Sequence, residues 1–155
     1  MQQNIDLIDL LHALNAEGAK YLMVGAYAFA FHGRARATSD VDLFVGADAD
    51  NAKRVWRALM AFGAPLTGLN ISDFASPGTF FIMGRPPNQI DVITAIDGVT
   101  FEHAWSRRVD SSYGGVPISY IGRDDLIANK KASNLRETSR LPTKVRTLSS
   151  DRRRA

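Results

Sequence analysis

The stretch VGAYAFAFHGRARATSDVDLFV, residues 24–45, decides how this chain folds. Its last seven residues, SDVDLFV, read as a strand in which Val41, Leu43 and Val45 are spaced to face a core. Asp40, Asp42 and Phe44 share one face of that strand, with the Cα atoms of the two aspartates roughly 7 Å apart, and Val41, Leu43 and Val45 share the other face. Both carboxylates can therefore converge on one ion.

Two carboxylates placed in this way repel each other and lose hydration, which costs several kcal/mol unless a cation or hydrogen bonds compensate. A hard divalent cation, Mg²⁺ or Mn²⁺, takes oxygen ligands and keeps coordination positions for phosphate and water. A pair of exposed aspartates on an edge strand is the alternative. Asp91, alone among apolar residues in QIDVIT, supports the metal hypothesis, because three carboxylates would meet if the two strands are neighbours.

Upstream, Gly25 ends the apolar run YLMV and precedes a short helical stretch. Free backbone N–H groups at the start of a helix can receive a phosphate. A simple tight turn is the alternative for this glycine.

The composition restricts the class of protein. A chain of 155 residues, 45% of them hydrophobic, is the size of one domain with its own core. The absence of cysteine excludes disulfides and thiolate metal sites. No apolar run reaches the roughly 20 residues that span a bilayer, and the first residues are acidic where a signal peptide is basic. We therefore expect a cytoplasmic protein with no membrane partner.

Periodicity and turn residues predict an α/β (α+β) domain, with a mixed central sheet flanked by helices. The expected helices are 5–14, 26–33, 51–63, 100–108 and 123–133, and the expected strands are 21–24, 39–45, 78–84, 88–96 and a hairpin at 109–121.

Charge is unevenly distributed along the chain. From Arg123 onward there are ten Lys or Arg against four Asp or Glu, whereas residues 1–122 carry nine against twelve. We expect a core domain over residues 1–135 and a basic, flexible tail over 136–155. Such a tail can contact RNA or an acidic partner, or it can be a solubilising terminus.

The order of these features resembles the nucleotidyltransferase superfamily that includes DNA polymerase beta. A small pair, Gly25 and Ala26, is followed by a short helix, by DVD in the next strand and by an aspartate on a later strand. With thirteen residues between the small pair and Asp40, and GRARATSDVDLFV leading in, the chain is most similar to the abortive-infection bacterial nucleotidyltransferases, which are toxins of toxin–antitoxin pairs. DDLIANKKA is similar to a lysine-bearing helix of that group. The resemblance covers roughly residues 5–135.

The resemblance implies a Mg²⁺-dependent (or Mn²⁺-dependent) enzyme. It would move a nucleotidyl group from an NTP to a hydroxyl of an RNA end or a protein, in a toxin–antitoxin or phage-defence setting with a cognate toxin or antitoxin as partner. The implied roles are a phosphate loop at Gly25 and Ala26, metal ligands at Asp40 and Asp42, a catalytic and metal-binding carboxylate at Asp91, and a nucleotide contact at Lys130.

Arg36 and Thr38 precede the aspartates, and they are candidates for contacting the nucleotide phosphates or bracing the carboxylates. For Arg36, a position that recurs in the resemblance, the alternative is a solvated loop cation that offsets local negative charge.

The chain departs from the family at two places. Ala26 stands where the family usually has Gly or Ser, so a hydroxyl contact to phosphate is lost. After Lys130 the family continues with an aspartate-rich helix, whereas this chain is basic and is broken by Pro142. A catalytically inactive nucleotidyltransferase-like binding module, an antitoxin or an RNA-binding partner, is therefore the alternative function. An antibiotic-modifying transferase uses the same chemistry, but the chain is short for it.

Overall fold

The computed structural model describes residues 5–33, 40–139 and 146–150. The described elements, in chain order, are α1 (Ile5–Ala16), β1 (Tyr21–Val24), α2 (Gly25–Phe31), β2 (Asp40–Val45), α3 (Ala49–Phe62), α4 (Ile71–Phe74), β3 (Thr79–Met83), β4 (Gln89–Ile93), α5 (Phe101–Ser106), β5 (Val109–Tyr113), β6 (Val116–Tyr120), α6 (Arg123–Ser139) and β7 (Arg146–Ser150).

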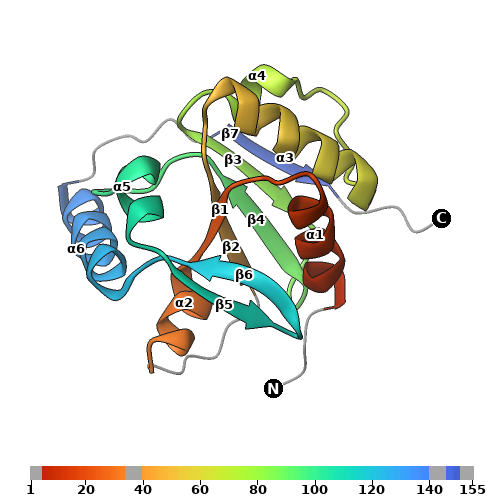
Figure 1. Ribbon diagram of the computed structural model, residues 1–155. Coiled ribbons are helices and arrows are strands. Elements are labelled where there is room, and N and C mark those ends of the chain that lie inside the picture. Colours follow the sequence, from red (N-terminus) through yellow and green to blue (C-terminus); the bar gives the residue numbers. More distant parts are fainter. Residues whose placement is uncertain (1–4, 34–39, 140–145, 151–155) are drawn as a thin grey trace.

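Within the described residues, seven strands form one mixed sheet in the order β5-β6-β1-β2-β4-β3-β7. The pairs β1·β6, β2·β4 and β3·β7 are parallel, and β1·β2, β3·β4 and β5·β6 are antiparallel. Helices α1, α3 and α4 lie together on one side of the molecule, and α5 and α6 lie on the other (Figure 1). The predicted single α/β domain with a mixed sheet and flanking helices is confirmed.

The apolar residues that the sequence pattern assigned to the core of β2 and α3 are buried in the structure. Val41, Leu43 and Val45 of β2 are each fully buried, so the apolar face of SDVDLFV points into the core. All four residues of β1, the neighbouring strand, are buried as well. Helix α3 packs its buried Val55 and Leu59 inward. Because Val41, Leu43 and Val45 point into the core, Asp40 and Asp42 must point to the opposite side of β2.

Two elements were not predicted from the sequence. Helix α4 has only four residues and depends on a capping box, in which Asn70 and Asp73 each hydrogen-bond the other's backbone N–H. Strand β7 pairs in parallel with β3 at the edge of the sheet. Helix α6 continues to Ser139 and so runs through residue 135, where the sequence places the end of the core domain.

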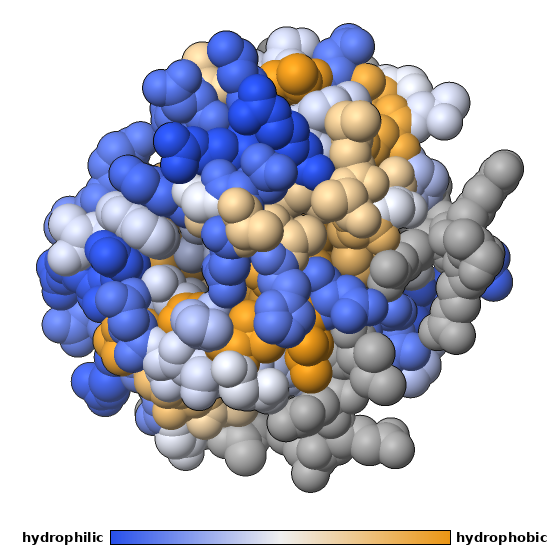
Figure 2. All heavy atoms as spheres, turned by 45° about the vertical axis from the view of Figure 1, so that its right-hand side comes forward, coloured by the Kyte–Doolittle hydropathy of each residue, from blue (hydrophilic) through white to orange (hydrophobic). Residues whose placement is uncertain are grey.

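The outer surface is mixed. The face in Figure 2 intersperses hydrophilic and apolar side chains, and Met60 and Ile71 are among the exposed large hydrophobic residues. Within the described part of the chain, no helix is both long and apolar enough to cross a membrane.

Candidate functional site

Asp42 and Asp91 face each other across two neighbouring parallel strands. The register of β2 and β4 places Asp42 opposite Asp91 and Asp40 opposite Gln89. The condition that the sequence left open, adjacency of the two aspartate-bearing strands, is therefore met. Asp91 is only 4% exposed, and Asp40 and Asp42 are half-buried.

A short hydrogen-bond chain joins these side chains. Gln89 Nε2 donates to Asp91 Oδ1 at 2.9 Å. The carboxyl groups of Asp42 and Asp91 are also hydrogen-bonded to each other. Two carboxylates can share such a bond only when one of them carries a proton.

The surroundings of the pair favour its protonated form. Burial, the hydrogen bond to Asp91 and the negative charges of Asp91 and Asp40 together raise the pKa of Asp42 to about 7. Burial also raises the pKa of Asp91, but the hydrogen bonds from Gln89 and Asp42 oppose that effect. Both carboxyl groups are therefore harder to deprotonate than an exposed aspartate, and the pair titrates as a unit.

Gly25 brings the backbone against this pair. It follows β1, whose last residue, Val24, lies opposite Asp42 in the antiparallel β1·β2 register. Gly25 has φ +66°, and a Cβ at this position would overlap Asp42 Oδ2 and lie 3.2 Å from Asp42 Cγ. Only glycine satisfies both the left-handed conformation and the close approach. Gly25 and Ala26, the predicted phosphate loop, form the start of α2 beside the carboxylates.

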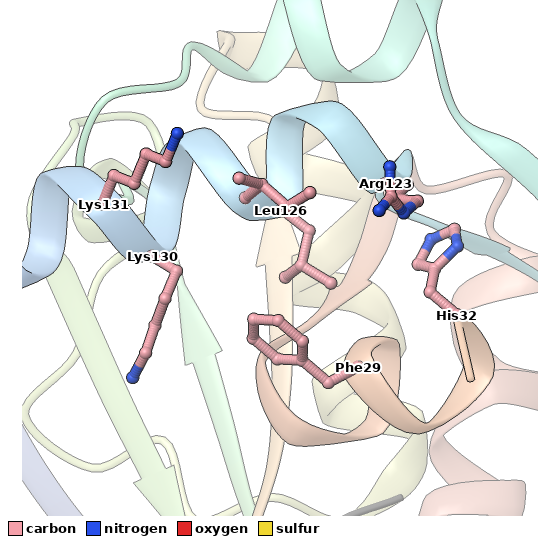
Figure 3. Close-up of a pocket in the computed structure, with 7 residues that line it drawn as sticks. Phe29, His32, Arg123, Leu126, Lys130 and Lys131 are labelled. Atoms are coloured by element: carbon pink, nitrogen blue, oxygen red, sulfur yellow. The ribbon is translucent and has the colours of Figure 1, made fainter. Parts of the chain in front are cut away.

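Lys130 lies in a pocket of about 240 Å³ between α2 and α6. Figure 3 shows the side chains of α6 above and those of α2 below. The lining residues are Phe29, His32, Arg123, Leu126, Ile127, Lys130 and Lys131. Sequence reasoning had singled out only Lys130 among them. Arg123, Leu126 and Lys130 are spaced three and four residues apart, a helical spacing that could have indicated Arg123 and Leu126.

The structure thus groups the predicted residues in two places joined by α2. Gly25 and Ala26 follow the end of β1 and lie beside the first residues of β2 and the middle of β4, which carry the three aspartates, and Lys130 lines the pocket. Arg36 and Thr38 fall outside the described residues.

The acidic pair has donor chemistry that suits a hard cation. Carboxylate oxygens are the ligands that Mg²⁺ and Mn²⁺ prefer. The pKa of Asp42 is raised first by burial and then by Asp91 and Asp40, and a bound cation would offset both effects. Within residues 5–33, 40–139 and 146–150, no three His, Cys, Asp or Glu side chains stand together as a preformed metal site. The pair fits a cation, and the third ligand stays a prediction.

The fold resembles that of a protein whose structure has been solved. In a search of solved structures, the chain is similar to a crystal structure of a protein from Thermotoga maritima described as a "putative nucleotidyltransferase", with a TM-score of 0.53 and 16% identity over 86% of this chain and 90% of that one. At this identity the similarity shows the fold alone. No protein-family profile matches the chain, and no curated protein matches it.

Proposed function

We propose that the protein is a cytoplasmic, metal-dependent nucleotidyltransferase that moves a nucleotidyl group from an NTP to an acceptor hydroxyl. The observation that carries the proposal is the placement of Asp42 opposite Asp91, with the Gly25 backbone against Asp42. A protein without use for this pair would gain stability by replacing it, because two buried carboxyl groups are costly.

Asp91 is the group that would accept the proton of the acceptor hydroxyl, since it lies opposite Asp42 and its carboxyl already accepts a hydrogen bond from Gln89. In the transfer, the hydroxyl oxygen bonds to the α-phosphorus, the bond from that phosphorus to pyrophosphate breaks, and pyrophosphate leaves. Backbone N–H groups at Gly25 and Ala26 would hold the phosphates, with Ala26 supplying no hydroxyl. Arg36, Thr38 and Lys130 are the further proposed nucleotide contacts.

Asp40, Asp42 and Asp91 would hold Mg²⁺ or Mn²⁺. The bound cation would supply neutralisation of the charge on the triphosphate oxygens. Binding it requires Asp42 to lose its proton, because a carboxylate coordinates only when deprotonated.

The experiment that tests the function is transfer of label from α-³²P-labelled NTPs to cellular RNA or protein in the presence of Mg²⁺. We expect labelled product with the wild-type chain and none with Asp42→Asn, which keeps the shape of the side chain. Asp50→Asn, an exposed position on α3, is the matched control. Full transfer by Asp42→Asn would contradict the proposal.

The labelled species in that experiment also identifies the acceptor, an RNA end or a protein. A toxin–antitoxin or phage-defence role predicts that expression slows growth and that Asp42→Asn relieves the effect. Binding of a partner without any transfer, unaffected by Asp40→Ala, would instead favour the inactive binding module.

A further inference from the structure

The pocket between α2 and α6 has an apolar middle and cationic ends. Arg123, Leu126 and Lys130 are spaced three and four residues apart on α6, so they form one stripe that spans roughly 10 Å of helix. Phe29 of α2 faces Leu126 across the pocket (Figure 3). The described lining residues include no Asp or Glu. This chemistry suits a ligand with a flat apolar body and negative charge.

The two ends of the pocket differ. Arg123 lies beside His32 at one end, and Lys130 lies at the other (Figure 3). Along α2, Phe29 precedes His32 and lies toward the Lys130 end, so the start of α2 at Gly25 continues in that direction. Phe29 is four residues after Gly25 and therefore shares its helix face. We infer that the Lys130 end lies on the side of the start of α2, where Gly25 contacts Asp42.

We propose that this pocket takes the base of the NTP, with the base packed on Phe29, its edge at Arg123 and its triphosphate directed past Lys130 toward Gly25. The inference rests on the proposed function, since it assigns the base end of the same substrate. A flat ring between Phe29 and Leu126 buries apolar surface on both of its faces.

This placement has a consequence for base selection. Arg123 is exposed, and a guanidinium offers hydrogen-bond donors only. A guanidinium pairs bidentately with the O6 and N7 acceptors of guanine, and it can donate to a keto oxygen of uracil. Adenine and cytosine have amino groups at the corresponding positions, and an amino group cannot accept these hydrogen bonds. His32 does not compete for this role through Nε2, because that nitrogen is hydrogen-bonded to the Ile121 carbonyl oxygen at 2.8 Å. We expect GTP to bind about tenfold more tightly than ATP.

Calorimetric titration of the full chain with GTP, ATP and inorganic tripolyphosphate, each with Mg²⁺, separates the base from the phosphates. Arg123→Leu is expected to bring GTP binding down to the level of ATP, and Phe29→Leu, which keeps apolar volume but removes the ring, to weaken both nucleotides at least fivefold. Neither variant is expected to change tripolyphosphate binding. Arg57→Leu, an exposed arginine on α3, is the matched control.

Nucleotide binding by Arg123→Leu and Phe29→Leu that equals the wild type would overturn the base pocket and leave the proposed transfer intact. Equal weakening of tripolyphosphate by both variants would also overturn it, because the pocket would then hold phosphates. A wild-type chain that bound neither nucleotide nor tripolyphosphate would overturn the proposed function, and the inference with it.

Discussion

Asp42 of β2 lies directly opposite Asp91 on the parallel strand β4, and burial raises the pKa of both carboxyl groups. The two groups hold one proton between them at a pH at which exposed aspartates hold none. A cation that binds the pair would therefore displace this proton. The protonation of the pair can be measured without knowing the acceptor.

The first prediction concerns stability and pH. The folded-state pKa of Asp42 is raised from 3.8 to about 7, so the folded state binds the proton more tightly than the unfolded state. This stabilisation is complete below pH 4 and is lost as pH rises toward 7, at up to about 1.4 kcal/mol per pH unit. Urea unfolding in EDTA between pH 5 and 8 should show this decline in wild type and a flatter profile in Asp42→Asn. Identical slopes would refute the assignment.

The second prediction concerns metal. At pH 8, where Asp42 is mostly deprotonated, Mg²⁺ should raise the thermal unfolding midpoint, because a ligand that binds only the folded state stabilises it. Removal of the metal with EDTA should reverse the shift. Asp42→Asn and Asp91→Asn should each lose most of it, and Asp50→Asn should keep it. An equal shift in all the variants would indicate a general salt effect.

The third prediction concerns Gly25. Gly25→Ala combines a strained left-handed conformation, which costs about 1–2 kcal/mol, with a clash against the Asp42 carboxyl. Gly115→Ala is a matched control, since Gly115 has φ +82° but a Cβ there has nothing within 4 Å. Gly25→Ala should therefore destabilise the fold more than Gly115→Ala in urea unfolding and should abolish nucleotidyl transfer. Equal destabilisation would show that Asp42 moves aside without cost.

The fourth prediction concerns the anchoring of α6, the helix that carries Arg123 and Lys130. Asp125 is buried in its first turn, with Oδ1 at 3.3 Å from His103 Nε2 and Oδ2 at 3.8 Å from Arg107 Nε. Asp125 Oδ2 has no hydrogen-bond partner among the described residues, so Asp125→Ala should cost about 1 kcal/mol in unfolding free energy, through loss of the contact to His103. Asp124→Ala should change the unfolding free energy by less than about 0.5 kcal/mol, because Asp124, the neighbouring partner of Arg107, is 74% exposed. A reversal of this order would place the anchor elsewhere.

Most of the fold was predictable because its elements have clear local patterns. The alternation in SDVDLFV correctly placed Val41, Leu43 and Val45 in the core, and the helical spacing did the same for Val55 and Leu59. Helix α4 was missed because four residues are too few for a periodic pattern. Strand β7 was missed because its five residues form a strand only by pairing with β3, a neighbour that the local sequence does not specify.

By itself, the sequence determined which side chains face away from the core: strand alternation places Asp40 and Asp42 on one face whatever their neighbours are. Only the tertiary structure decided that Asp91, about fifty residues later, lies opposite Asp42 and that Phe29 of α2 meets the Arg123 stripe of α6. The physical reason is that alternation fixes the face of a residue but not its partner strand or helix. Partners are selected by packing between segments that are distant in the chain.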